Sequence, residues 1–335
     1  MEQKTKPRIG ITIGDIAGIG LEVALKALAD NRVLHYCTPI IYGSASVVNR
    51  YRKLLALENF SFHQVQAFDQ LHPKKVNVLN CLEEELEFTP GVPSPATGAL
   101  ARAALLRAAQ DLKEGHIQAV VTAPIDKDNT QGEGFQFPGH TEFFTTYFNA
   151  PESLMFLVAD GLRVATLTGH IPLKEVASRL TADLLIRKLT ILDNSLRKDF
   201  SIQKPKIAVL GLNPHAGENG LLGTEETEIV LPVIEQFKNK GNLVFGPFPA
   251  DGFFGTRSFQ KFDATLALYH DQGLIPFKTL AFERGVNFTA GLPIVRTSPD
   301  HGTAYDIAGQ NKADETSFRE ALFAAIDILR ARAGV

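Results

Sequence analysis

Three histidines of this 335-residue chain, His170, His215 and His270, each follow a short apolar run in a segment that also contains glycine. Continuous apolar runs of this length are typical of strands that are covered on both faces, as in parallel sheets. Ligands of open parallel sheets gather beyond the carboxyl ends of the strands. We therefore expect the three imidazoles at one edge of a sheet, where ligand-binding and active sites of such folds usually lie.

Imidazole chemistry at such an edge points to a metal ion. Neutral imidazole is the commonest protein ligand for zinc-like ions, and three histidines with an open fourth position are typical of a catalytic zinc site. The three histidines are 45 and 55 residues apart in the chain, so nothing local brings them together. A single histidine after a strand is more often a hydrogen-bonded turn residue, which is the alternative for each one alone.

Several residues could bind an anion. His140 and Thr141 open a predicted helical stretch, and the N-terminus of a helix favours negative charge. Lys278 and Arg296, with Asn287 between them, lie in segments otherwise poor in charge, which we expect to be loops. An isolated basic residue beside apolar sequence often faces a bound anion. For Lys278, an ammonium that extends to solvent is the alternative.

Two glycine-containing segments are candidates for cofactor binding. The segment 11–22 (ITIGDIAGIGLE) either carries phosphate on its backbone amides or uses its glycines for tight packing. Its spacing differs from the G-x-G-x-x-G dinucleotide fingerprint. The segment 299–311 (PDHGTAYDIAGQN), before a final helix, either lines a site for a flat nucleobase or forms a plain turn.

The elements that must position these residues alternate along the chain. We predict strands at 8–14, 39–43, 76–81, 119–123, 154–159, 164–168, 206–211, 243–245, 264–269 and 293–297. We predict helices at 21–29, 45–55, 96–113, 173–180, 182–196, 225–240 and 317–333, with a shorter one at 142–148. This alternation indicates an α/β fold with mainly parallel sheets. The length favours two domains.

Composition excludes several classes of protein. The net charge is −3 without a long basic run, which argues against a nucleic-acid partner. The two cysteines, Cys37 and Cys81, form no CxxC motif, which suits the reducing cytoplasm and argues against a thiolate zinc site. No apolar stretch approaches the roughly 20 residues that span a bilayer, and the N-terminus lacks a signal sequence. We therefore expect a cytoplasmic protein without membrane contact.

Eight motifs closely resemble the 4-hydroxythreonine-4-phosphate dehydrogenase (PdxA) family. In chain order they are GDIAGIGLE (14–22), TAPIDK (122–127), PGHTEFF (138–144), TGHIPL (168–173), GLNPHAGE (211–218), GPFPAD (246–251), YHDQGLIPFK (269–278) and GVNFTAGLPIVRTSPDHGTAYDIAG (285–309). They span nearly the whole chain. The HGTAYDIAG segment also looks like the adenine-side loop of isocitrate and isopropylmalate dehydrogenases, whose fold this family shares.

The resemblance implies an isopropylmalate dehydrogenase-like fold of two α/β/α domains, with the active site in the interdomain cleft at the interface of a homodimer. We expect residues 1–125 plus 255–335 to form a discontinuous cofactor-side domain. Residues 126–254 would form the domain for metal, substrate and dimerisation.

The resemblance also implies site residues. One divalent metal ion (zinc, cobalt or magnesium) would be held by His170 and His215 of one subunit and His270 of the other. Substrate contacts fall on His140, Thr141, Lys278, Asn287 and Arg296. NAD, with NADP as the alternative, is expected at His301, Gly302, Thr303 and Asn311. Lys278, Asp251 and Asp271 are candidates for proton transfer, chosen by their proximity in the motifs. Ile16 and Leu21 replace usual prolines and Asp126 replaces a usual asparagine, which affects loop rigidity and cofactor approach.

The activity that the resemblance implies is oxidation of 4-phosphooxy-L-threonine by NAD⁺, followed by decarboxylation to 3-amino-2-oxopropyl phosphate, in pyridoxine 5'-phosphate (vitamin B6) biosynthesis. The main alternative is a paralogue that acts on 4-phosphoerythronate or 4-phosphothreonate, which lack the amine. A phosphate acetyltransferase would need neither the three histidines nor the HGTA loop. A metabolite-binding protein without activity would be expected to lack a site residue, and none is missing.

Overall fold

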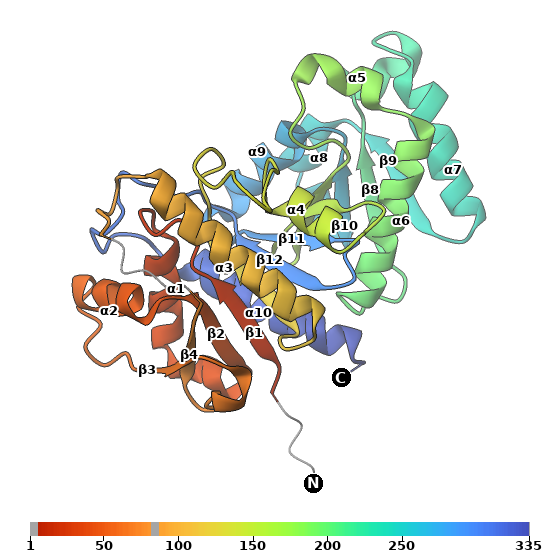
Figure 1. Ribbon diagram of the computed structural model, residues 1–335. Helices are drawn as coiled ribbons and strands as arrows, with labels where there is room; N and C mark the ends of the chain where they lie inside the picture. Colours follow the sequence, from red (N-terminus) through yellow and green to blue (C-terminus); the bar gives the residue numbers. More distant parts are fainter. Residues whose placement is uncertain (1–5, 82–86, 335) are drawn as a thin grey trace. The chain divides into compact units, whose positions relative to one another are not determined.

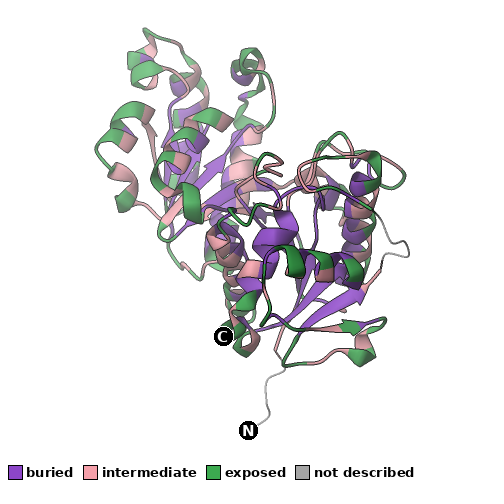
Figure 2. Ribbon diagram, turned by 90° about the vertical axis from the view of Figure 1, so that its left-hand side faces the viewer, coloured by how far each residue is buried: buried purple, intermediate pink, exposed green. Residues whose placement is uncertain are grey.

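The computed structural model describes residues 6–81 and 87–334. The chain divides into two compact units, each discontinuous in sequence. Unit 1 comprises Met1–Pro151 and Leu292–Arg330, and unit 2 comprises Glu152–Gly291 and Ala331–Val335. Each unit has an α/β architecture in which buried strands are covered by helices with exposed outer faces (Figure 1, Figure 2).

Unit 1 is built on a parallel sheet with the strand order β3-β4-β2-β1-β5-β12. Its strands are β1 (Arg8–Thr12), β2 (Thr38–Gly43), β3 (Phe62–Val65), β4 (Val76–Asn80), β5 (Ala119–Thr122) and β12 (Val295–Pro299). The central strands are continuous apolar runs because both faces of the sheet are covered. The parallel sheet predicted from those runs is confirmed.

The helices of unit 1 include ones on both faces of this sheet. They are α1 (Gly20–Ala29), α2 (Ala45–Leu54), α3 (Pro95–Lys113), α4 (His140–Tyr147) and α10 (Thr316–Arg332). The crossovers β1-α1-β2 and β4-α3-β5 run in opposite directions across the sheet, and right-handed crossovers therefore place α1 and α3 on opposite faces. Figure 1 shows α3 in front of β1 and α10 behind it. A capping box between Ser94 and Thr97 fixes the start of α3.

Unit 2 contains a mixed sheet with the strand order β11-β6-β7-β10-β8-β9. Its strands are β6 (Leu154–Ala159), β7 (Leu162–Thr166), β8 (Lys206–Leu210), β9 (Leu243–Phe248), β10 (Ala264–Ala267) and β11 (Val286–Ala290). β6 is antiparallel to both β7 and β11, whereas β7, β10, β8 and β9 are parallel to one another. The parallel part of this sheet therefore contains the three strands that precede the histidines.

The helices of unit 2 are α5 (Val176–Arg179), α6 (Ala182–Lys198), α7 (Leu231–Asn239), α8 (Ala250–Gly255) and α9 (His270–Ala281). A 3₁₀ segment, η4 (Pro214–Gly220), follows β8, and a π-helical turn, η5 (Glu226–Val230), precedes α7. The remaining short helical turns are η1 (Asn31–His35), η2 (Phe68–Gln70), η3 (Leu173–Glu175), η6 (Ser258–Lys261) and η7 (Phe282–Arg284).

Helix α9 packs closely on β7 and β10 because Gly273 has no side chain. A Cβ atom at Gly273 would lie 2.9 Å from Val164 Cγ1 and 3.0 Å from the Cβ atom of Ala267. Leu274 and Phe277, on the same helix, are buried in the core between helix and sheet. The helix that begins at His270 is thereby held against the strands.

Several predictions about elements were wrong, and the compact units differ in extent from the expected domains. Strands β3 and β11 and helices α8 and α9 were not predicted, and Lys278 and Asn287 lie in α9 and β11 rather than in loops. Arg296 lies in β12, which overlaps the strand predicted at 293–297, and not in a loop. The expected domain boundaries at 125 and 254 differ from the unit boundaries at 151 and 291. Residues 255–291 belong to unit 2 because β10 pairs with β7 and β8, and β11 pairs with β6.

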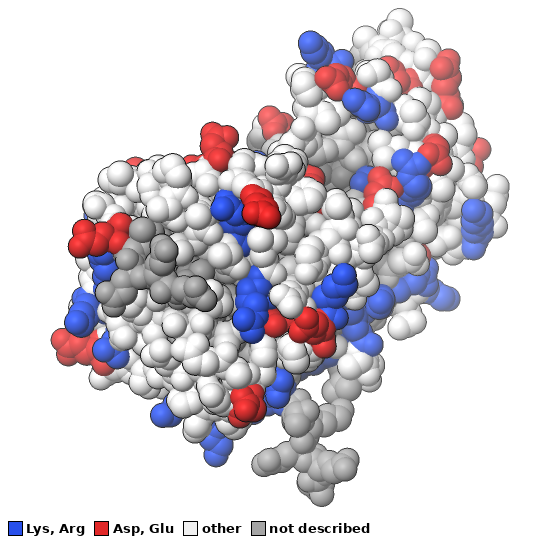
Figure 3. Space-filling model, viewed as in Figure 1, with Lys and Arg blue, Asp and Glu red and all other residues white. Residues whose placement is uncertain are grey.

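The visible surface carries a mixture of charges. Figure 3 shows basic and acidic side chains interspersed on that face, without a large area of one sign. Among the described residues, no helix has the length and apolar content that a membrane span requires.

We predict that Gly273→Val destabilises the fold by about 1–3 kcal/mol, because the new side chain overlaps Val164 and Ala267. Gly252→Val is the matched control, since Gly252 is also helical and a Cβ atom there would meet nothing within 4 Å among the described residues beyond its own helix backbone. Its free energy of unfolding should change by less than about 0.5 kcal/mol. Denaturant unfolding measures both, and equal effects would contradict the proposed packing.

Candidate functional site

His170, His215 and His270 follow three neighbouring parallel strands of unit 2. The strands β7, β10 and β8 are adjacent in the sheet and run in the same direction. Their carboxyl ends therefore lie at one edge of the sheet, as the sequence predicted. His170 and His215 are exposed, and His270, the first residue of α9, is half-buried. All three imidazoles are accessible to a ligand.

The His170 and His270 rings lie close together within one chain, with their centres 5.4 Å apart. Two imidazoles that bind one zinc ion tetrahedrally through nitrogen, at 2.0–2.1 Å, have ring centres about 5 Å apart. The observed separation therefore fits a shared metal ion. The resemblance instead assigned His270 to the metal of the neighbouring subunit, so the proximity within one chain is a difference from that expectation.

The three histidines do not form a compact three-ligand group within the described residues. The group whose donor atoms all lie within 4.8 Å of one another is Asp111, Glu114 and His116, near the C-terminus of α3. Asp111 pairs there with Arg107 at 2.9 Å, and His116 lies 3.3 Å from Glu114. Asp111 is thus engaged by Arg107, and Glu114 by His116, and the group precedes β5, away from the carboxyl edge of the sheet.

Asp271 contacts the imidazole of His270 directly. Its Oδ1 atom lies 2.7 Å from Nδ1 of His270. A proton on Nδ1 that is donated to this carboxylate leaves the lone pair of Nε2 available for a metal ion, and carboxylates commonly orient metal-binding histidines in this way. The contact fits a residue that orients the imidazole of His270.

Hydrogen bonds join the three strand ends that precede the histidines. Thr168 donates its hydroxyl to the carbonyl oxygen of Leu268 at 2.9 Å, which links the ends of β7 and β10. Gln272 accepts from the amide of Leu268 at 2.7 Å and donates to the carbonyl oxygen of Gly211 at 2.6 Å, which links β10 to the end of β8. Sequence reasoning did not identify Thr168 or Gln272.

His215 lies in a left-handed turn. The five residues 215–219 all have positive φ, from 44° to 82°, and only Gly217 among them is a glycine. A left-handed conformation costs roughly 1–2 kcal/mol for each non-glycine residue. Such outliers persist only where surrounding contacts impose them, and they cluster at functional sites. The turn is therefore evidence that the direction of His215 matters.

Unit 1 contains a buried cation beside a half-buried imidazole whose Nε2 atom is inaccessible to solvent. Arg296 in β12 is 3% exposed and donates from Nε and a terminal nitrogen to the hydroxyl of Thr122, at 3.1 Å and 2.7 Å. His140 is the first residue of α4, and its Nε2 atom is inaccessible without a hydrogen-bond partner among the described residues. A buried unsatisfied polar atom is costly, so each one needs an explanation such as a ligand.

Burial and neighbouring charge set the protonation of this pair. Burial lowers the pKa of Arg296 to about 10, with Glu142 opposing the shift, so the guanidinium stays charged at neutral pH. Burial, and then the positive charges of Arg296 and Lys127, hold the pKa of His140 well below 6.5. The guanidinium of Arg296 therefore supplies the positive charge that attracts an anion. The imidazole of His140 is uncharged, and it can bind the same anion without adding a second positive charge.

The other predicted substrate residues occupy separate elements. Thr141 follows His140 at the start of α4, as expected. In unit 2, the side-chain oxygen of Asn287 in β11 is buried and makes no hydrogen bond within the described residues. Lys278 lies in α9 with its ammonium 5.9 Å from the ring centre of Phe282. Asp251 is exposed in α8, a helix that contacts the loop of His215.

The predicted cofactor residues lie in a loop of unit 1 that packs against the glycine-containing segment 14–20. Thr303 accepts from the amide of Ile19 at 2.9 Å. The amides of Asp15, Ala17 and Gly18 also donate to protein oxygens. These amides are therefore occupied, which supports tight packing over phosphate binding for this segment. His301, Gly302 and Asn311 are half-buried or exposed.

Tyr305 and Asp126 anchor the predicted cofactor loop. The hydroxyl of Tyr305 donates to Asp15 at 2.8 Å and contacts Asp126 at 3.2 Å. The other oxygen of Asp126 accepts from the amides of Asp128 and Asn129. An asparagine could accept the same turn bonds, which is why the departure at position 126 leaves this turn intact.

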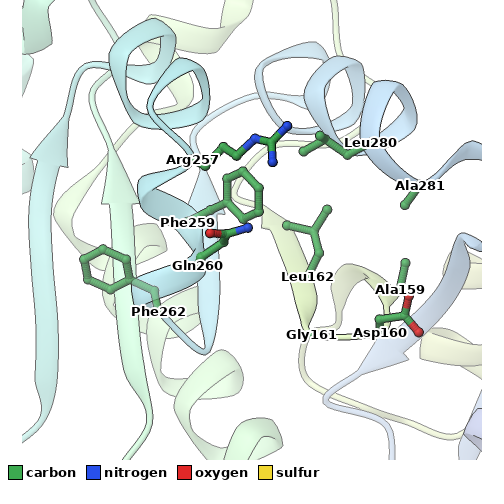
Figure 4. Close-up of a pocket in the computed structure, with 10 residues that line it drawn as sticks. All are labelled: Ala159, Asp160, Gly161, Leu162, Arg257, Phe259, Gln260, Phe262, Leu280 and Ala281. Carbon is green, nitrogen blue, oxygen red and sulfur yellow. The ribbon is translucent and has the colours of Figure 1, made fainter.

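A separate cavity of about 430 Å³ lies in unit 2 (Figure 4). Asp160 and Leu162 line it from the β6–β7 turn, and Phe259 and Phe262 line it from the segment before β10. It therefore lies at the amino ends of β7 and β10, opposite the end that carries the histidines. Figure 4 shows Arg257 and Leu280 at its rim.

A family model, a relative in sequence and a solved structure all match this chain to the same family over most of its length. A family model described as "Pyridoxal phosphate biosynthetic protein PdxA" matches residues 35–325. A 4-hydroxythreonine-4-phosphate dehydrogenase of Bacteroides thetaiotaomicron is 49% identical over 332 residues, which cover 98% of this chain and 91% of that protein. A crystal structure of 4-hydroxythreonine-4-phosphate dehydrogenase from Klebsiella pneumoniae matches with a TM-score of 0.81 at 35% identity, over 98% of this chain and 99% of that one.

An isocitrate dehydrogenase from Methylococcus capsulatus shares the fold at lower similarity. It matches with a TM-score of 0.51 at 12% identity, over 98% of this chain and 87% of that one. At this identity the likeness concerns the fold alone. The expected fold, related to that of isocitrate dehydrogenase, is confirmed.

We predict that His140→Gln flattens the dependence of stability on pH. The pKa of His140 is lowered on folding, so the unfolded chain binds the additional proton as the pH falls below about 6.5. The folded state of the wild type therefore loses stability below that pH, by up to about 1.4 kcal/mol per pH unit from this group. Unfolding free energies at pH 7.5 and 5.5 should differ less in the variant. Identical slopes would contradict a neutral His140.

Proposed function

The chain belongs to the PdxA family of pyridoxal phosphate biosynthetic proteins, and from this premise we propose that it is a metal- and NAD-dependent 4-hydroxythreonine-4-phosphate dehydrogenase. The observation that carries the proposal is the placement of His170, His270 and His215 after three neighbouring parallel strands. The dehydrogenase of Bacteroides thetaiotaomicron that is 49% identical supports the same substrate.

The proposed reaction converts 4-phosphooxy-L-threonine and NAD⁺ to 3-amino-2-oxopropyl phosphate, CO₂ and NADH. The hydride leaves C3 of the substrate for NAD⁺, and the C3 hydroxyl loses its proton. The resulting β-keto acid then breaks its bond to the carboxylate, which leaves as CO₂. A proton added to the remaining carbon completes the ketone product.

His170, His215 and His270 would hold one divalent metal ion. The donor set fits zinc or cobalt better than magnesium, because imidazole is a softer ligand than oxygen. When bound, the ion lowers the pKa of an alcohol that it contacts and stabilises negative charge on that oxygen. The contact with Asp271 would keep Nε2 of His270 free of a proton.

The remaining residues would bind the substrate and move its protons. Arg296, with its fixed charge, and neutral His140 would bind an anionic group, together with Thr141 at the N-terminus of α4. The free side-chain oxygen of Asn287 would accept a hydrogen bond from the substrate. Lys278, together with Asp251 or Asp271, is our candidate for proton transfer.

We propose that NAD binds at the loop that contains His301, Gly302, Thr303 and Asn311. The anchoring of this loop through Tyr305 supports a preformed surface. We also propose a homodimer, for which the resemblance implies a shared active site. The resemblance assigns His270 to the metal of the neighbouring subunit, whereas the 5.4 Å between the His170 and His270 rings favours one metal for both residues of the same chain.

We predict NADH formation from 4-phosphooxy-L-threonine and NAD⁺ that is lost after chelation and restored by zinc or cobalt. Absorbance at the NADH band, with each metal added separately, measures it. The control substrate is 4-phospho-D-threonate, which has a hydroxyl in place of the amine. A higher kcat/KM on this control would replace the proposed substrate with the sugar acid of the alternative paralogue.

We predict that His215→Ala lowers metal-dependent turnover by more than about 100-fold, which exceeds the usual effect of a change outside the metal ligands. His35→Ala, an exposed histidine of η1 in unit 1, is the matched control and should retain wild-type turnover. Steady-state kinetics with saturating zinc measure both variants. Full turnover of the His215→Ala variant in chelator-treated protein would refute the metal assignment.

A further inference from the structure

Glu226 is a buried carboxylate beneath the loop that carries His215. It is 1% exposed and is the first residue of the π-helical turn η5. Turns of this kind are frequent at functional sites. Within the described residues its oxygens accept hydrogen bonds from Asn213 and have no salt-bridge partner. A buried negative charge without a cation is unfavourable, so its position needs an explanation.

The contacts of Glu226 enclose the start of the left-handed turn. One oxygen accepts from the backbone amide of Asn213 at 2.7 Å, and the other accepts from its side-chain amide at 3.0 Å. Two residues after His215, a Cβ atom on Gly217 would lie only 2.7 Å from the second oxygen. The carboxylate therefore contacts the loop on both sides of His215, before it through Asn213 and after it at Gly217.

These contacts explain how an unfavourable backbone is maintained. The residues of a left-handed turn adopt it only when tertiary contacts exclude the alternatives. The two bonds of Glu226 fix the residue from which the turn begins, and its volume leaves room only for a glycine at position 217. The direction of the His215 side chain follows from the backbone that Glu226 imposes.

We propose that Glu226 is the positioning residue for His215: it holds the loop so that the imidazole is preoriented toward the metal ion, and its negative charge favours a cation nearby. This inference rests on the proposed role of His215 as a metal ligand. Residues that orient metal ligands typically contribute 10- to 100-fold to metal affinity. Glu226 does not contact the metal or the substrate in this proposal.

The test compares Glu226→Gln with Glu228→Gln in the full-length protein. Both variants remove one negative charge from the same segment, but Glu228 is exposed and contacts neither Asn213 nor Gly217 in the structure. The amide of the Glu226→Gln variant cannot accept both bonds from Asn213, since one of its positions is a donor. Asn213→Ala removes the side-chain amide that donates to Glu226, and Asn213 is only half-buried. This variant replaces Glu226→Gln in the test if Glu226→Gln does not fold.

Two measurements separate positioning from general stability. Amide hydrogen exchange of residues 211–224 in metal-free protein reports the loop itself. Titration with Co²⁺, followed through its visible absorption, reports ligation by histidine. We expect faster exchange in this segment and a Co²⁺ Kd raised about 10- to 100-fold for Glu226→Gln or Asn213→Ala. Glu228→Gln should match the wild type in both.

Three outcomes would overturn the inference: unchanged exchange in both loop variants, faster exchange with unchanged Co²⁺ affinity, or no Co²⁺ binding by the wild type. A different result would refute the proposed function and still support the inference. In that case the wild type binds Co²⁺ and the variants show the expected changes in exchange and Co²⁺ affinity, but the wild type forms no NADH from either substrate. The two proposals are thereby tested separately.

Discussion

The parallel pairing of β7, β10 and β8 is the constraint on which the candidate site depends. Because these strands are adjacent and run in one direction, the segments that follow them meet at one edge of the sheet. Hydrogen bonds from Thr168 and Gln272 then join the three ends. A reversal of any one strand would place its histidine at the opposite edge. The fold thus determines which residues can act together, and the loops determine only their orientation.

Much of the fold could be predicted from the sequence because its central strands are buried on both faces. Runs such as residues 154–159 and 207–210 are apolar throughout and end at glycine or polar residues. The elements that were missed lack such a signal. Helix α9 contains Gly273 and Pro276, which usually interrupt helices, and it is stabilised by packing on the sheet instead. The boundary of unit 2 was missed because it depends on the pairing of β10 and β11, which only tertiary structure shows.

The candidate site, like the fold, could be predicted in part from the sequence. The histidines were identified because imidazoles after apolar runs are chemically conspicuous, and the buried environment of Arg296 agrees with its apolar sequence neighbours. Glu226 was not identified, because it lies among Glu225 and Glu228 in a stretch that looks like a solvated helix. Its burial arises from a contact with Asn213, thirteen residues earlier. A residue that acts by holding the backbone of another residue leaves no recognisable pattern in the sequence.

The hydrogen bond between Thr168 and Leu268 has a consequence for the order in which the site can form. The two residues are 100 positions apart, whereas Asn213 and Glu226 are separated by 13. Closing the longer loop costs about 2 kcal/mol more in chain entropy. The contacts around His215 can therefore form early, from a short segment of chain, and the approach of His170 to His270 must await the pairing of distant strands. By this argument the contact between Asn213 and Glu226 has a lower entropic barrier than the contact that brings His170 near His270.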